Sequence, residues 1–117
     1  MTTPDATALV LEQVQAYNAR DLDKMLSYYA ADAQILDGDG TFLEKGYAAI
    51  RQVFGRVFAA NPDLHAEISV AVQVGQWVMV HSTVPNWAMA DGSRAEMQWI
   101  ELYQVVDDKI QRVLLFR

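Results

Sequence analysis

The stretch RAEMQWIELYQV, residues 94–105, decides how this chain is expected to fold, because it alternates like a strand and carries a carboxylate among apolar residues. Successive side chains of a β-strand point to opposite faces of the sheet. One face therefore carries Ala95, Met97, Trp99, Glu101, Tyr103 and Val105. An ionised carboxylate between two aromatic rings costs free energy unless it is paired or its pKa rises. Glu101 is thus the first candidate functional residue.

Two interpretations of Glu101 stay open at this stage. It lies in a pocket where its protonation has a use, or it is exposed to solvent or paired with an arginine such as Arg112 or Arg117.

Composition predicts one globular domain that spans residues 1–117. Hydrophobic residues make up 52% of the chain and charged residues 21%, as in proteins with a packed core. The formal net charge is −6, and the 9 basic residues are scattered, which argues against nucleic acid or an anionic membrane as a partner. The absence of cysteine excludes disulfides, thiolate metal sites and a cysteine nucleophile.

The amino-terminal residues MTTPDATALV lack a basic segment followed by an apolar core, and no apolar run in the chain approaches 18 residues. We therefore expect a cytoplasmic protein.

The first part of the chain predicts helices and a short hairpin. Thr3, Pro4 and Asp5 are typical of a helix start, and Asp21 is placed to cap a second helix. Asp39-Gly40 favours a turn, and the Asn61-Pro62 pair ends a third helix. The expected helices are residues 4–19, 22–29 and 47–60, and the expected short strands are 34–37 and 41–43.

The second part of the chain predicts an antiparallel sheet. Alternating runs cover residues 64–74, 77–87, 94–105 and 109–117, with turns between them. Helices followed by a long meander indicate an α+β domain, in which the helices cover one face of a curved sheet and the other face stays open.

Several strings in this order resemble a known family. The runs YNARDLDKMLSYYAADAQILD, NPDLHAEI, WVMVHSTV and ELYQVVDDKIQRVLLFR are similar to the nuclear transport factor 2-like superfamily, which includes ketosteroid isomerases, SnoaL-like polyketide cyclases and scytalone dehydratases. The resemblance is closest to an uncharacterised bacterial branch and implies a cone-shaped, cystatin-like α+β roll, with three N-terminal helices packed on a curved, mostly antiparallel sheet. That scaffold hosts both enzymes and non-catalytic binders.

The resemblance also implies site residues. The general-base aspartate of the isomerases falls on Asp37 and their proton-donating acid falls on Glu101, a group that an apolar site can keep neutral. Their oxyanion-hole tyrosine falls on Gln13 and a supporting tyrosine falls on Phe54, which argues against a steroid isomerase. Tyr17, one turn after Gln13, is either a substitute phenol or a core residue.

His81 is the third candidate catalytic residue. It shares an alternating face with Trp77, Met79 and Thr83, in the strand expected beside Glu101, and a neutral imidazole near a carboxyl makes an acid/base pair. The alternative is a histidine that is hydrogen-bonded within the sheet or at a dimer face. His65 is expected at the surface, and two histidines so far apart predict no metal site.

Two function classes follow. In the first, Asp37, His81 and Glu101 move protons in a small apolar substrate without a cofactor, by isomerisation, cyclisation, dehydration or hydration. The second is a ligand-binding or assembly module that uses the same pocket without turnover. The residues expected to contact the ligand are Tyr17, Phe54, Met97, Trp99 and Tyr103.

The open face of the sheet predicts a homodimer. The apolar residues expected on it are Val78, Val80, Val84, Ile100 and Leu102, with Val113 or Leu114, and the polar ones are Ser82, Gln98 and Gln104. A contiguous band of this kind exceeds what monomers usually expose, and a two-fold contact is the commonest way to bury it.

Overall fold

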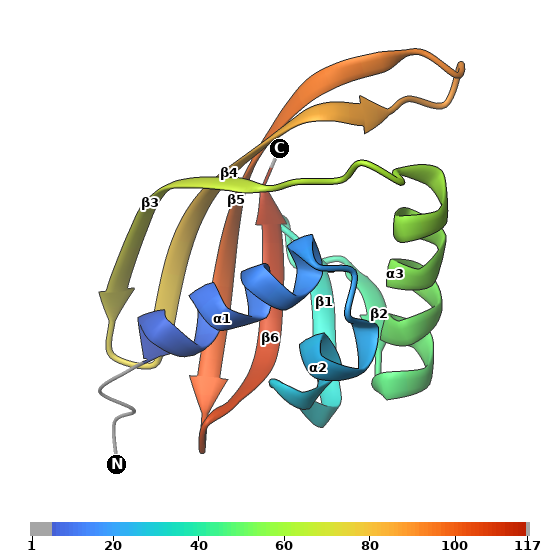
Figure 1. The fold of residues 1–117 in the computed structure, drawn as a ribbon. Helices are drawn as coiled ribbons and strands as arrows, with labels where there is room; N and C mark the ends of the chain where they lie inside the picture. The colour runs from blue at the N-terminus through green and yellow to red at the C-terminus, as the bar shows by residue number, and fades with distance from the viewer. Residues whose placement is uncertain (1–5, 117) are drawn as a thin grey trace.

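The computed structural model describes residues 6–116, in which three helices pack on one face of a curved six-stranded sheet (Figure 1). The elements in chain order are α1 (Ala6–Asn18), α2 (Leu22–Ser27), β1 (Tyr29–Asp37), β2 (Phe42–Lys45), α3 (Tyr47–Ala60), β3 (Glu67–Val74), β4 (Trp77–Ala88), β5 (Arg94–Val106) and β6 (Lys109–Phe116). The expected α+β class is confirmed. The third helix, α3, follows the hairpin of β1 and β2, which is the order expected from the sequence.

The helices follow local signals in the sequence. Buried side chains recur along α1 at Ala6, Val10, Gln13 and Val14, as expected for a helix with one face on a sheet. The side chain of Asp21 accepts a hydrogen bond from the Lys24 amide at 3.2 Å and caps α2. The bounds of α3 match the expected 47–60, whereas the expected helix start at residues 3–5 lies outside the described residues.

The strands lie in the order β2-β1-β6-β5-β4-β3, and all neighbours are antiparallel except β1 and β6. The last strand therefore lies between the first strand and β5 (Figure 1). β1 begins at Tyr29, five residues before the expected start at residue 34, because Tyr29 pairs with Ile110 of β6. That pairing joins residues far apart in the chain, so no local pattern predicts it.

The register between β4 and β5 decides which side chains face the helices. Val80 is opposite Glu101, and Ser82 is opposite Trp99, so each pair shares a face. The same face carries Val78 and Val84, and all four of these β4 residues are buried. The prediction from the sequence that these four residues lie on the open face is therefore wrong.

The open face carries the alternate residues of the same strands. His81 is opposite Ile100, and Leu102 is opposite Leu114, whereas Val113 is buried on the helix-covered face. Gln98 and Gln104 lie on the open face, as expected. Val70 and Val72 of β3 extend the apolar surface and are 45% and 46% exposed.

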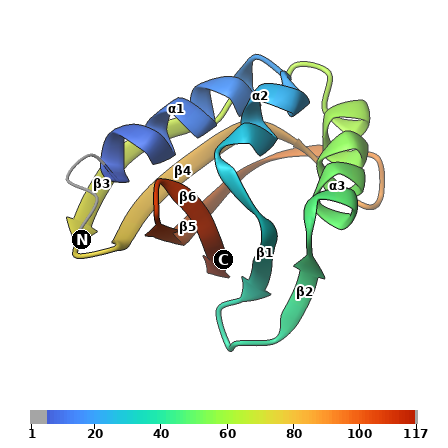
Figure 2. The ribbon, with the colours of Figure 1, turned by 90° about the horizontal axis from the view of Figure 1, so that it is seen from below.

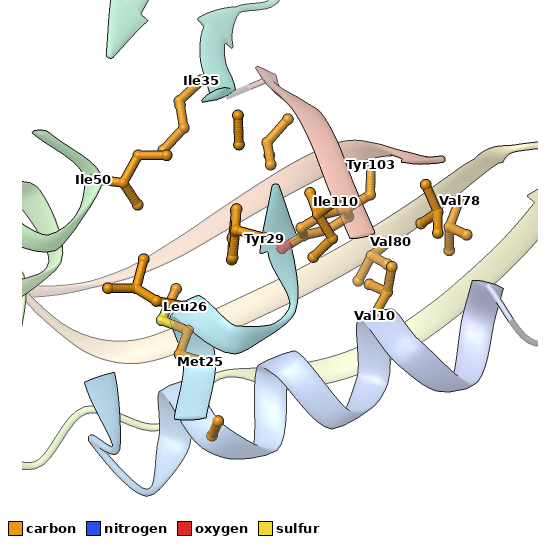
Figure 3. Close-up of a cluster of buried hydrophobic side chains, with 14 of the residues drawn as sticks. Val10, Met25, Leu26, Tyr29, Ile35, Ile50, Val78, Val80, Tyr103 and Ile110 are labelled. Atoms are coloured by element: carbon orange, nitrogen blue, oxygen red, sulfur yellow. The ribbon is translucent and has the colours of Figure 1, made fainter. Parts of the chain in front are cut away.

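The main core lies between α1, α2, α3 and the covered face of the sheet. Figure 3 shows Val10 of α1 beside Val78 and Val80 of β4, with Tyr29 next to Ile110. Met25 and Leu26 of α2 complete one end of this cluster. No helix among residues 6–116 is long and apolar enough to cross a membrane.

Beyond a bulge between Val84 and Trp87, the ends of β4 and β5 form an arm that reaches past the end of α3 (Figures 1 and 2). The Asn61 side chain connects this arm to the end of α3 by hydrogen bonds. Its side-chain oxygen accepts from the Ala88 amide at 2.8 Å and from Arg94 at 3.3 Å, and its side-chain nitrogen donates to the Val57 carbonyl at 2.9 Å.

Candidate active site

A cavity of about 430 Å³ lies between the helices and the covered face of the sheet. Its wall is mostly apolar and is formed by residues of all six strands together with the inner sides of α1 and α3. The lining residues are Gln13, Val14, Tyr17, Tyr29, Ile35, Leu43, Glu44, Val53, Phe54, Val57, Ala66, Ile68, Ser82, Val84, Trp87, Met97, Trp99, Glu101, Tyr103, Val113 and Leu115.

The Glu101 carboxyl is the centre of the polar part of this wall. The Ser82 hydroxyl donates to its Oε1 at 2.8 Å, and the Tyr103 hydroxyl donates to its Oε2 at 2.9 Å. Ser82 is brought there by the β4–β5 register, and Tyr103 by the two-residue period of β5. The side chain is partly accessible from the cavity but is otherwise surrounded by protein.

Burial raises the pKa of the Glu101 carboxyl above its usual range, although the hydrogen bonds from Ser82 and Tyr103 act in the opposite direction. A raised pKa means that this carboxyl holds its proton to a higher pH than an exposed glutamate does. It is then able to donate a proton to a bound ligand.

Two more polar groups extend this arrangement toward α1. The Tyr29 hydroxyl donates to Gln13 Oε1 at 2.8 Å, and both side chains are buried. Burial, followed by the nearby Glu101 charge, raises the pKa of Tyr29 and also that of Tyr103. These phenols therefore stay protonated and act as hydrogen-bond donors.

Aromatic rings form the rest of the wall. Tyr17 of α1 meets Phe54 of α3 edge to face, with ring centroids 5.9 Å apart. Trp87 and Trp99 meet in the same way at 4.9 Å, across the base of the arm. Burial, followed by the charge of Glu101, raises the pKa of Tyr17.

The known family of SnoaL-like domains matches this chain over residues 10–113. The chain belongs to the SnoaL-like domain family. No curated protein matches it in sequence. This SnoaL-like domain is similar to an uncharacterised cystatin-fold protein from Novosphingobium aromaticivorans, with 30% identity, a TM-score of 0.85, and coverage of 96% of this chain and 97% of that one.

Two further structures share the fold at lower identity. AclR, a putative hydroxylase from Streptomyces galilaeus, is 21% identical with a TM-score of 0.81, over 96% of this chain and 77% of that one. SalBIII, an epoxide hydrolase/cyclase-like enzyme of pyran ring formation in the polyether salinomycin, is 19% identical with a TM-score of 0.83, over 96% and 89%. The expected SnoaL-like membership is confirmed by the family match, and proteins described as SnoaL-like and as having a ketosteroid isomerase-like fold share this fold at 22% and 18% identity.

The structure brings most of the sequence-derived site residues to one cavity. Glu101 lines it together with all five residues expected to contact a ligand: Tyr17, Phe54, Met97, Trp99 and Tyr103. Arg112 is opposite Gln104 on the open face and does not pair with Glu101, and Arg117 lies outside the described residues.

His81 does not join this group, whereas Asp37 lies on the covered face beside it. Asp37 is opposite Leu115, a wall residue that is itself opposite Glu101, so Asp37 and Glu101 lie in one row two strands apart, although Asp37 does not itself line the cavity. The Asp37 Oδ1 accepts from the Gly38 amide at 3.3 Å. His81 points to the open face, where its ring contacts the Ser69 hydroxyl and where Nε2 lies 2.9 Å from Gln98 Oε1. The expected acid/base pair of His81 and Glu101 is wrong, because neighbouring strands in register place the two residues on opposite faces.

Sequence reasoning did not predict five polar or aromatic residues of the wall as site residues: Gln13, Tyr29, Glu44, Ser82 and Trp87. Gln13 had a local signal, since it is a polar residue within the buried stripe of α1. The face of the sheet on which Glu44 and Ser82 lie depends on strand register, which no local pattern predicts. Among residues 6–116, no three His, Asp or Glu side chains are grouped so that they could hold a metal ion.

Proposed function

We propose that this SnoaL-like domain binds a small apolar molecule and rearranges it by acid/base chemistry without a cofactor, by isomerisation, cyclisation or dehydration. The observation that carries the proposal is the Glu101 carboxyl, which lies in an apolar cavity with its pKa raised by burial. Such a carboxyl is suited to hold a proton at neutral pH and to release it to a substrate oxygen.

One carboxyl is sufficient for the proton balance. Glu101 gives its proton to an oxygen that leaves, or to an epoxide or carbonyl oxygen. The resulting carboxylate then takes a proton from a neighbouring carbon or hydroxyl of the same molecule. The donors Ser82 and Tyr103 stabilise the carboxylate between the two transfers, and the apolar wall keeps water away from the reacting atoms.

The second candidate function is ligand binding without turnover. Two observations favour it. Asp37, onto which the isomerase base falls, lies in the row of Glu101 but two strands away from it, and it does not line the cavity. Gln13, onto which the oxyanion-hole tyrosine falls, accepts a hydrogen bond from Tyr29.

One experiment separates the two candidates. The small molecule that co-purifies with the protein is identified by mass spectrometry and then incubated with the wild type and with Glu101→Gln. For an enzyme we expect conversion by the wild type and at least about a hundredfold slower conversion by the variant, with binding retained. A ligand that both proteins bind and neither converts would instead establish the binding module.

A further inference from the structure

The cavity wall carries two carboxyl groups and no basic side chain among the described residues that line it. The second carboxyl is Glu44 of β2. It is opposite Ile35, a buried residue of the covered face, so Glu44 is directed to the cavity side of the sheet. Lys45 follows it in the strand and points to the opposite face.

No cation neutralises Glu44 within residues 6–116. Its carboxyl takes part in no hydrogen bond or ion pair with another described residue. Burial and Glu101 raise the pKa of Tyr17, and the Arg20 charge opposes this rise, but Arg20 does not line the cavity, and its guanidinium donates to the carbonyls of Asn18 at 3.3 Å and Leu64 at 3.0 Å. Among the described residues that line the cavity, the ionisable groups other than tyrosine are therefore both carboxyls, in a protein whose net charge is −6.

The two carboxyls lie at different ends of the cavity. Glu44, Ile35, Val113 and Tyr103 form one row across β2, β1, β6 and β5. Three strand spacings of about 4.8 Å separate the ends of this row by about 14 Å along the sheet. Glu101 is on the far strand, in the row next to that of Tyr103.

Aromatic rings also line the space in which a ligand would contact these carboxyls. Tyr17, Phe54, Trp87 and Trp99 belong to this wall, and the faces of such rings attract cations. An anion placed there would lose its hydration and would meet Glu44 with no counter-charge from the wall. A protonated amine would gain a counter-ion instead.

We infer that the cavity selects an apolar ligand that carries a protonated amine, bound at Glu44, and that it excludes carboxylates and phosphates. This inference rests on the proposed function, because it names the ligand class of the same cavity. Glu101 is then left to act on the oxygen-bearing end of the ligand.

Three probes of nearly the same shape test it: 2-naphthylmethylamine, 2-naphthylmethanol and 2-naphthoate. Affinities are measured by calorimetry at neutral pH and low salt. The indole N–H signals of Trp87 and Trp99 locate the bound probe by NMR, and Trp77, which lies on the open face opposite Gln104, serves as an internal reference. We expect the amine to bind roughly fivefold more tightly than the alcohol, and the carboxylate to bind most weakly.

Two variants test whether Glu44 causes the preference for the amine over the alcohol. Glu44→Gln should make the affinities for the amine and the alcohol equal while the affinity for the alcohol stays unchanged. Glu96→Gln removes the same charge from an exposed position of β5 that is outside the wall, and it should keep the preference.

The inference is overturned if the wild type binds amine and alcohol equally, or if the preference survives in Glu44→Gln. If the alcohol shifts the Trp87 and Trp99 signals in that case, the proposal that the cavity binds a small apolar molecule is retained. If none of the three probes shifts those signals, the proposed binding function fails as well.

Discussion

At the residue scale, two opposing effects set the pKa of the Glu101 carboxyl. Its two oxygens accept from Ser82 and Tyr103, and these bonds stabilise the charged form. Burial opposes the charged form and is the larger effect, so the pKa of the carboxyl is raised. The same balance makes Glu101 a source of instability when it is ionised, because its charge is only partly compensated.

This balance predicts a pH-dependent effect of Glu101→Gln on stability. The folded-state pKa of Glu101 is above the unfolded value, so the folded protein binds the proton more tightly, and wild-type stability falls as pH rises from about the unfolded value through the folded value. Glutamine does not titrate. We therefore expect the Tm difference, variant minus wild type, to be more positive at pH 8 than at pH 4.

Thermal unfolding followed by circular dichroism measures this difference. Glu96→Gln on the exposed side of β5 is the matched control and should show a smaller change between the two pH values. A Glu101→Gln difference that is constant with pH would contradict an uncompensated charge at this site.

At the element scale, the sequence predicted what depends on local periodicity and missed what depends on pairing. The bounds of α3 were predicted from its apolar spacing and from Asn61-Pro62. The alternation of β5 placed Met97, Trp99, Glu101 and Tyr103 on one face, and the structure places all four in the cavity wall.

The face of β4 could not be predicted in the same way. Both of its alternating sets are apolar, with Val78 and Val80 on one side and Trp77 and Met79 on the other. Only the register with β5, which includes a bulge before Trp87, shows which set is covered. A shift of one residue exchanges the two faces, and this explains why His81 was assigned to the wrong one.

The arm formed by β4 and β5 gives a prediction of its own. Asn61→Ala removes the acceptor of the Ala88 amide, which is left without its partner, whereas the Val57 carbonyl keeps the hydrogen bond from the Asn61 backbone amide. We expect a loss of about 2 kcal/mol in the free energy of unfolding, measured by urea denaturation, and faster hydrogen exchange at the Ala88 amide.

Asp63→Ala, in the exposed part of the same loop, is the control and should change neither quantity appreciably. If Asn61→Ala leaves the Ala88 amide protected, the arm is held by other contacts, such as the packing of Trp87 on Trp99.

At the scale of the whole molecule, the open face of the sheet still supports a homodimer as a proposal. The residues that support this proposal are those that the strand register places on the open face. Val70 and Val72 of β3 and Ile100 of β5 are exposed on this face. Leu102 of β5 and Leu114 of β6 lie opposite each other on the same face. An apolar surface of this kind in water favours a self-complementary contact.

We expect the double variant Ile100→Glu and Leu102→Glu to be a monomer, because it places two charges in that surface. Sedimentation velocity at tens of micromolar compares it with the wild type. Gln15→Glu with Gln52→Glu adds the same charge on exposed positions of α1 and α3 and should stay dimeric. A monomeric wild type under these conditions would end the dimer proposal.

Everything proposed for the cavity depends on a Glu101 carboxyl that holds its proton in apolar surroundings. The most direct measurement is a pH titration of the glutamate side-chain carboxyl carbons by NMR, with Glu101 assigned through the Glu101→Gln variant. We expect a Glu101 midpoint clearly above that of the exposed Glu96, and a further rise in Tyr103→Phe, which removes one donor to the charged form. A Glu101 midpoint equal to that of Glu96 would contradict it.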